Sequence, residues 1–341
     1  MPEILRPKGI FAALLCIALL PSCAFVAPLE SLWESYKTRF IQNGRVVDTG
    51  NQGVTHSEGQ GYGMLLAVAA GDRPTFESLW QWTRANLQVR GDHLFMWRHR
   101  PHVPLSQEDP NNATDGDLLI AWALLEAAGR WNEPIWEREA RAILADLKPK
   151  IVRRWHSHTV LLPGAYGFEH QGRLTLNLSY WVFPALRRFA AADSDPVWRE
   201  LVNGGLALIR QARFGTWKLP SDWVEAAETL QPDPKHPPRF GYDAVRIPLY
   251  LVWGGYHNRE LLSPFVDFWK AFGGFLPPWL DLELGCVGAY PASGGTRAIY
   301  NLSRFAIGKS WWLYLPSPTP KDAYYSTSLI LLSHLAARRI P

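Results

Sequence analysis

Three separate segments of the chain each place a carboxylate next to glycine or aromatic residues: Ser57–Met64, Ala113–Asp117 and Phe240–Arg246. The acidic residues of interest in them are Glu58, Asp115 and Asp243. Two carboxyl groups that face each other across a cleft suit cleavage of a glycosidic bond, because one protonates the leaving oxygen while the other activates water. We therefore interpret these three residues as candidate catalytic carboxylates.

A purely structural interpretation of the first two segments is helix capping. Ser57 with Gln60, and Thr114 with Asp117, have the spacing of a capping box, and acids in a first helical turn interact favourably with the helix dipole. Three closely spaced glycines argue against capping as the whole explanation: Gly59, Gly61 and Gly63. Each lowers the stability of a helix by roughly 1 kcal/mol relative to alanine. We expect the missing side chains to open space for a substrate cleft.

Other kinds of chemistry find little support in the sequence. There is no His-Glu-x-x-His helix and no Gly-x-Ser-x-Gly elbow, and Gly308-Lys309-Ser310 lacks the upstream glycine of a phosphate loop. The ten histidines show no metal-ligand spacing, so we expect no metal and no cofactor. A net charge of +4 over 341 residues, without a basic run, gives no support for a nucleic-acid partner.

The aromatic content of the chain is high, with 17 Trp, 12 Tyr and 15 Phe. Flat aromatic rings can stack on the apolar faces of pyranose rings without any charge. Trp97 and Trp223 are candidates for such sugar platforms, and packing in the core is the alternative for both.

Helical periodicity extends over nearly the whole chain from residue 29 onward, whereas the two-residue alternation of strands is scarce. One kind of helix is apolar on all sides and comprises Gly63–Ala70, Leu118–Leu125, Tyr180–Leu186, Ile247–Trp253 and Ser328–Leu335. The other kind is amphipathic and comprises Thr75–Gln88, Pro134–Leu147, Pro196–Ala212 and Glu260–Phe272. Helices of the first kind must be buried, and those of the second can cover them. About eleven or twelve helices in this alternation predict an all-α fold, an (α/α)6 barrel of alternating inner and outer helices. An irregular stack of helical hairpins is the alternative.

This alternation explains how distant carboxylates can meet. Each candidate segment lies at the N-terminal edge of an inner helix, and inner helices run in the same direction because an outer helix returns the chain between them. The N-terminal ends of these inner helices should therefore lie at the same end of the barrel, and Glu58, Asp115 and Asp243 should lie there with them. Asn177 and Tyr180 begin another inner helix in this interpretation and should join them.

Residues 1–24 have the pattern of a secretory signal, with Arg6 and Lys8 before the apolar stretch Gly9–Leu20. We expect an exported protein, periplasmic or secreted, with one catalytic domain over residues 25–341 that acts as a monomer. Cleavage after Ala24 is one possibility, and a lipoprotein signal that leaves Cys23 as a lipid anchor is the other. Cys286 is the single cysteine of residues 25–341, so we expect no disulfide within the domain.

Several segments together resemble those of glycoside hydrolase family 8. The stretch Ala113–Trp131 resembles the family signature over its whole length. Ser57–Met64 resembles the family's acid motif, and Phe240–Arg246 resembles its base segment. Asn177–Tyr180 and Asp322–Tyr325 are similar to two further family segments.

The resemblance implies an (α/α)6 barrel, inversion at the anomeric carbon and no metal in catalysis. It assigns Glu58 as the acid and Asp243 as the base. Asp115 would grip the sugar at the cleavage point and favour its distorted ring, while Arg246 and Tyr180 would orient the water, the base and that sugar. Asn177 and Tyr62 complete the set of expected substrate-binding residues, alongside Trp97 and Trp223.

Within the family, Gly44–Asp48 and Leu219–Val224 resemble segments of the periplasmic cellulases that accompany bacterial cellulose synthase. This implies endo-acting hydrolysis of a β-1,4-glucan, with the cellulose synthase complex as a further partner. Xylan, chitosan or mixed-linkage glucan are alternative substrates. A polysaccharide lyase and a non-catalytic glucan-binding protein are the alternatives from other functional classes.

Overall fold

The computed structural model describes residues 28–340, so the expected signal segment, Cys23 included, lies outside the described residues. The described part contains eleven α-helices, none of them long and apolar enough to cross a membrane. They are α1 (Leu29–Phe40), α2 (Ser57–Ala70), α3 (Arg73–Asn86), α4 (Thr114–Trp131), α5 (Pro134–Ile151), α6 (Phe183–Ala192), α7 (Val197–Gln211), α8 (Arg246–Trp253), α9 (Arg259–Ala271), α10 (Gly294–Ala306) and α11 (Tyr324–Ala337).

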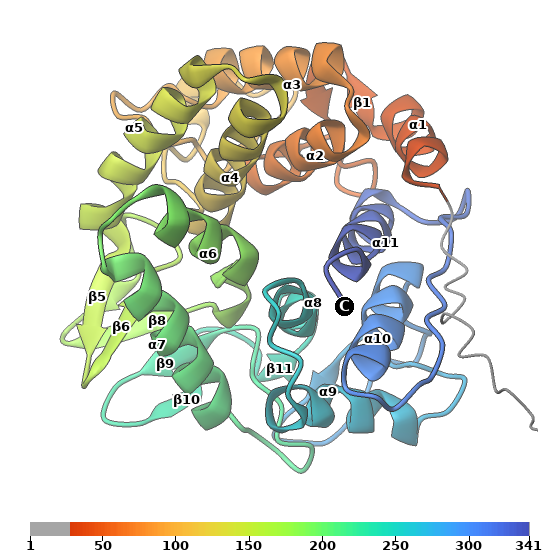
Figure 1. The fold of residues 1–341 in the computed structure, drawn as a ribbon. Coiled ribbons are helices and arrows are strands. Elements are labelled where there is room, and N and C mark those ends of the chain that lie inside the picture. Colours follow the sequence, from red (N-terminus) through yellow and green to blue (C-terminus); the bar gives the residue numbers. More distant parts are fainter. Residues whose placement is uncertain (1–27, 341) are drawn as a thin grey trace, which may run out of the picture.

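These helices form a closed double ring (Figure 1). Helices α2, α4, α6, α8 and α11 surround the centre, and α1, α3, α5, α7 and α9 lie outside them. Helices α2, α4, α8 and α11 are buried on nearly every side, whereas α3, α5, α7 and α9 bury one face. This is the predicted (α/α)6 barrel. The strict alternation ends after α9, because α10 buries one face against α8, α9 and α11.

Most predicted helices agree with the structure to within a few residues, but the third predicted inner helix is displaced. The sequence placed it at Tyr180–Leu186, whereas α6 begins at Phe183 and a 3₁₀ turn, Leu178–Tyr180, precedes it. The ψ angles of Trp181 and Val182, 76° and 77°, are not helical. Pro184 then lies in the first turn, where its missing N–H leaves no helical hydrogen bond unmade.

Short strands, which the sequence did not reveal, complete the fold. They are β1 (Ile41–Gln42), β2 (Arg45–Val46), β3 (Thr55–His56), β4 (Arg98–His99), β5 (Val152–Trp155), β6 (His158–Leu161), β7 (Glu169–His170), β8 (Arg173–Leu176), β9 (Val224–Ala226), β10 (Leu230–Pro232), β11 (Arg239–Phe240) and β12 (Leu280–Asp281). Strands of two to four residues are too short to show a two-residue periodicity.

The largest sheet has the antiparallel order β10-β9-β8-β7. Its register pairs Leu176 with Val224, so the residues that follow β8 and precede β9 emerge side by side. These residues are Asn177 on one strand and Trp223 on the other. The sheet thus brings two expected site segments together beside the barrel.

Candidate active site

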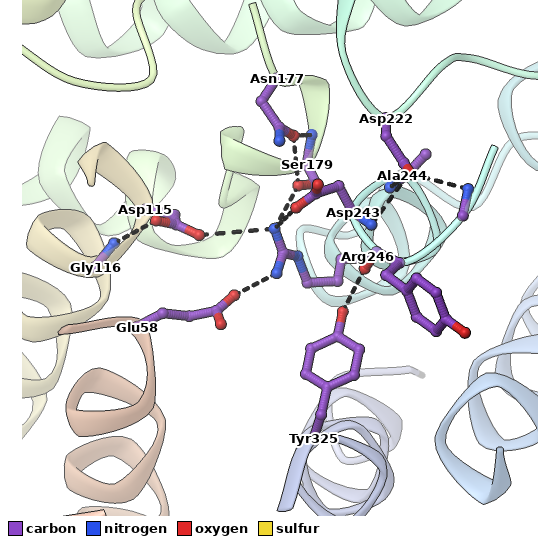
Figure 2. Close-up of polar contacts among 12 residues, drawn as sticks. Glu58, Asp115, Gly116, Asn177, Ser179, Asp222, Asp243, Ala244, Arg246 and Tyr325 are labelled. Atoms are coloured by element: carbon purple, nitrogen blue, oxygen red, sulfur yellow. Dashed lines mark hydrogen bonds and ion pairs between the residues drawn. The ribbon is translucent and has the colours of Figure 1, made fainter. Parts of the chain in front are cut away.

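The three candidate carboxylates meet around one guanidinium group, that of Arg246 (Figure 2). Glu58 is the second residue of α2, Asp115 is the second residue of α4, and Asp243 lies three residues before the start of α8. Arg246 donates from Nη1 to Glu58 Oε1 at 2.5 Å and from Nη2 to Asp243 Oδ1 at 2.9 Å. Its Nη2 atom also lies 3.7 Å from Asp115 Oδ2. The barrel topology therefore brings the three segments to one end, as the alternation of helices predicts.

These groups line a cleft that is open to solvent. Glu58 keeps 16% of its side chain exposed, Asp243 keeps 29% and Asp115 keeps 4%. Other residues that line the cleft include Asp48, His56, Trp97, Tyr180, Tyr324 and Tyr325. The three carboxylates and the Arg246 guanidinium group therefore line the same open cleft.

Three carboxylates share a single buried cation, and the pKa values of two of them, Asp115 and Asp243, are raised. Burial, and then the charge of Glu58, raise the pKa of Asp115 well above its usual range, although Arg246 opposes the shift. Burial also raises the pKa of Asp243, with Arg246 and the Asn177 amide acting against it. A raised pKa brings the proton affinity of a carboxylate nearer to neutral pH, which is what a group that must accept a proton from water requires.

Glu58 is supported from below by two buried tyrosines. Tyr62 donates its hydroxyl to Glu58 Oε1 at 2.9 Å, and the Tyr250 hydroxyl lies 2.8 Å from that of Tyr62. Burial raises the pKa of Tyr62 well above its usual value, so its hydroxyl keeps its proton. Tyr62 is fully buried and lies outside the cleft lining. The expectation that it contacts substrate is wrong, and it positions the acidic side chain instead.

Asn177 also supports the site without reaching the cleft. It is fully buried, and its Oδ1 atom accepts from the backbone N–H and the hydroxyl of Ser179. The Ser179 hydroxyl in turn accepts from Arg246 Nη2 at 2.7 Å. Asn177 therefore positions Ser179, and Ser179 positions the Arg246 guanidinium group. Asn177 does not line the cleft, where it was expected to bind sugar directly. Tyr180 lines the cleft, and its ring lies 5.9 Å from the Arg246 guanidinium carbon.

The two candidate aromatic platforms differ in position. Trp97 lines the cleft, where it stacks with His56 at 6.1 Å and donates its Nε1–H to Asp109 at 3.0 Å. Trp223 does not line the cleft. Its ring stacks on that of His236 at 4.6 Å, and its edge meets the Tyr180 ring at 6.4 Å. Trp223 is half-buried and therefore lies beside Tyr180, next to the cleft.

Capping does not account for the first two segments. The N-cap residues of α2 and α4 are His56 and Ala113, and neither makes a side-chain cap. Gln60 reaches across to the backbone N–H of Val46, and Thr114 donates to the carbonyl of Leu162. Asp117 accepts from the backbone N–H of Phe95 and from Asn112. The side chains of Gln60, Thr114 and Asp117 therefore tie the helix ends to neighbouring segments.

The glycines after Glu58 permit close packing and do not open the cleft. A Cβ atom on Gly59 would lie 2.6 Å from the Tyr324 hydroxyl, and one on Gly61 would lie 2.5 Å from Leu119 Cβ. The expectation that these positions provide substrate space is therefore wrong. They let α2 approach α4 and α11 closely, which fixes the spacing between the helices that carry Glu58 and Asp115.

Two positioning residues escaped the reasoning from the sequence. Asp222 Oδ1 accepts the backbone N–H groups of Gly241, Asp243 and Ala244, at 2.9, 3.1 and 2.8 Å. Tyr325 donates its hydroxyl to the carbonyl of Tyr242 at 2.6 Å. Both residues fall in segments with a family resemblance, and that is the signal by which they could have been found.

Metal binding has no support in the described part of the chain. Within residues 28–340 no group of three or more His, Cys, Asp or Glu side chains is arranged to hold a metal ion.

Comparison with known proteins identifies the family. Residues 4–339 match the family model described as glycosyl hydrolases family 8. A probable endoglucanase of Novacetimonas hansenii is 42% identical over 313 residues, which is 89% of each chain. Endoglucanase Cel10 of Klebsiella pneumoniae, a family 8 glycosyl hydrolase, superposes with a TM-score of 0.85 at 40% identity and covers 90% of this chain and 99% of its own. The endo-beta-1,4-glucanase CMCax of Acetobacter xylinum gives a TM-score of 0.82 at 40% identity and covers 92% of this chain and 98% of its own. The chain therefore belongs to glycosyl hydrolase family 8.

Proposed function

We propose that this glycoside hydrolase cleaves internal β-1,4-glucosidic bonds of cellulose or a related glucan by single displacement. The observation that supports it most is the bridge formed by Arg246, which holds Glu58 and Asp243 in one open cleft with Asp115 beside them. Two carboxyl groups flanking a cleavage point are what an inverting hydrolase needs. The similar endoglucanases favour a glucan as the substrate.

Glu58 is the proposed acid. Its Oε1 atom already accepts hydrogen bonds from Tyr62 and Arg246, which leaves Oε2 to carry the transferable proton. That proton passes to the glycosidic oxygen as the bond between this oxygen and the anomeric carbon breaks. The leaving sugar therefore departs as a neutral alcohol.

Asp243 is the proposed base. It takes a proton from a water molecule whose oxygen attacks the anomeric carbon on the face opposite the leaving group, and this inverts the configuration. Arg246 holds the Asp243 carboxylate at 2.9 Å. Asp115, almost completely buried at the floor of the cleft, grips the sugar at the cleavage point, and Tyr180 lies against that same sugar. Exchange of protons with solvent returns Glu58 and Asp243 to their starting states.

The proposal includes export and a role beside cellulose synthesis. Its support is the signal pattern in residues 1–24 and the resemblance of Gly44–Asp48 and Leu219–Val224 to cellulases of that setting. Mass spectrometry of the mature N-terminus tests the processing. A chain beginning at Phe25 indicates a soluble periplasmic or secreted enzyme, whereas a lipid-modified Cys23 indicates an anchored one. An unprocessed Met1 in the cytoplasmic fraction would contradict export.

Incubation with soluble carboxymethylcellulose tests the activity. We expect a rapid fall in viscosity, new reducing ends, and the α-anomer as the first product seen by NMR. An initial β-anomer would refute single displacement. An unsaturated product that absorbs ultraviolet light would indicate a lyase, and binding without cleavage would indicate a glucan-binding protein. Parallel assays on xylan, chitosan and mixed-linkage glucan establish which substrate is preferred.

A further inference from the structure

A loop after α10 exposes three aromatic rings in four residues. Trp311, Trp312 and Tyr314 expose 83%, 55% and 54% of their surface, whereas Leu313 and Leu315 are buried. The buried leucines attach this stretch to the core. Because buried and exposed residues alternate from Trp312 to Leu315, the aromatic rings of Trp312 and Tyr314 point outward. Large apolar side chains that gather on the surface contribute little to folding and mark sites of interaction.

The backbone that leads into these rings is held by contacts with α9. Arg259 donates to the carbonyl of Ile307 at 3.2 Å, and Lys309 forms an ion pair with Asp267 at 2.5 Å. Within the loop, the Ser310 hydroxyl donates to the carbonyl of Trp312 at 2.6 Å. A loop held in place before binding loses little backbone freedom when a ligand arrives, so its contacts contribute more to affinity.

The rings and their polar neighbours suit a carbohydrate. The Trp311 and Trp312 rings are nearly parallel, with centroids 5.8 Å apart and planes 20° apart. Trp312 and Tyr314 border a hollow that is also lined by Asn301, Arg304 and Ser310. No hydrogen bond within residues 28–340 uses the side chains of Asn301 or Arg304, so an amide and a guanidinium group are available beside the rings. Flat apolar faces next to hydrogen-bonding groups match a sugar ring, which is apolar on its faces and carries hydroxyls at its edge.

We propose that Trp311, Trp312 and Tyr314 form a second binding site for a β-1,4-glucan chain, separate from the cleft. The inference rests on the proposed function, because it takes its ligand from the polymer that the cleft would cleave. The two sites share no lining residue, and the surface site has no carboxylate in its lining. It therefore holds the polymer without cleaving it. A protein partner is less suited, since a stable interface buries roughly 800 Å² on each side, which is more than three side chains and a short hollow provide.

Binding to insoluble microcrystalline cellulose tests this site. All chains carry Glu58→Gln, so that the polymer is not consumed during the measurement. We expect Trp311→Ala combined with Trp312→Ala to weaken binding at least tenfold. The matched control is Leu284→Ala, which removes another apolar side chain that is 81% exposed, and it should bind as the parent does. With Glu58 restored, the double variant should keep its activity on soluble carboxymethylcellulose and lose activity on the insoluble polymer.

Unchanged cellulose binding in the double variant would overturn the proposal, and so would an equal loss in Leu284→Ala. Sedimentation velocity distinguishes the remaining case. If the parent is a dimer that the double variant abolishes while cellulose binding persists, the rings contact a second copy and the proposal is wrong. Failure of the intact enzyme to cleave carboxymethylcellulose would refute the proposed function alone, because the binding comparison uses inactive chains.

Discussion

The Oδ1 atom of Asp222 accepts the backbone N–H of Asp243 at 3.1 Å. The same oxygen also accepts the N–H groups of Gly241 and Ala244, so one buried carboxylate fixes the whole turn that carries the proposed base. From the other side, Tyr325 binds the carbonyl of Tyr242. The position of Asp243 relative to Arg246 therefore depends on a residue that lies outside the cleft lining.

Replacing Asp222 should reduce catalysis more than substrate binding. We expect Asp222→Ala to lower kcat at least tenfold with a smaller change in KM, because three buried N–H groups lose their acceptor and the turn shifts. Asp222→Asn keeps an acceptor oxygen and should restore much of the loss. Steady-state kinetics on a soluble cello-oligosaccharide check both variants. If Asp222→Asn is as impaired as Asp222→Ala, the role of this oxygen as an anchor is wrong.

Glu58→Gln should abolish the proposed acid function while the fold remains. The amide keeps an oxygen for Tyr62 and Arg246 but has no proton to donate, so we expect kcat to fall by roughly 10²–10⁴-fold, the usual contribution of a general acid. Circular dichroism and the unfolding temperature should match those of the parent. A variant with wild-type rate would show that the acid is another residue.

Asp243→Ala should lose a comparable amount of activity and respond to azide. Without the base, water is no longer activated, and the shortened side chain leaves room for a small anionic nucleophile on the same face. We expect added azide to restore part of the rate and to give an α-glycosyl azide, detectable by mass spectrometry and NMR. Glu58→Gln is the control and should show no such rescue. Rescue of Glu58→Gln but not of Asp243→Ala would reverse the two assignments.

Reasoning from the sequence succeeds where a long pattern determines the structure. The all-round apolar stretches of α2 and α4 require burial, and burial in a ring brings Glu58 and Asp115 to one end. The same reasoning fails where contacts between distant segments determine the local structure. The α6 boundary depends on non-helical angles at Trp181 and Val182, and the function of Asp222 depends on a turn 20 residues away. The hydrophobic periodicity encodes neither feature, and for Asp222 the family resemblance of Leu219–Val224 marks the segment without revealing its contact.

The glycines after Glu58 illustrate the same limit and lead to a test. Gly61→Ala places a Cβ 2.5 Å from Leu119 Cβ, so α2 and α4 must separate. We expect the free energy of unfolding to fall by about 1–3 kcal/mol, together with a loss of activity. Gly129 in α4 is the matched control, since nothing lies within 4 Å of its added Cβ. Gly129→Ala should stabilise the chain by about 0.5–1 kcal/mol, and equal effects at both positions would contradict the packing role. Urea denaturation measures both.

Buried Asp117 should contribute more to the stability of the protein at pH 5 than at pH 8, whereas His56, His99 and His334, whose pKa values burial lowers, contribute in the opposite direction. Burial raises the pKa of Asp117 to about 7, although Asn112 and the Phe95 N–H bind its carboxylate. The folded chain therefore holds this proton more tightly than the unfolded chain, and the stability that results is lost as the pH rises through 7. Asp72 and Asp193 have pKa values lowered to about 2, so they stay charged at both pH values and do not contribute. We expect Asp117 to contribute a difference on the order of 1 kcal/mol or more, measured by urea unfolding at the two pH values. Asp117→Asn should be less stable overall, because it loses the contact with Asn112, yet show a smaller difference. An unchanged difference in that variant would place its source elsewhere.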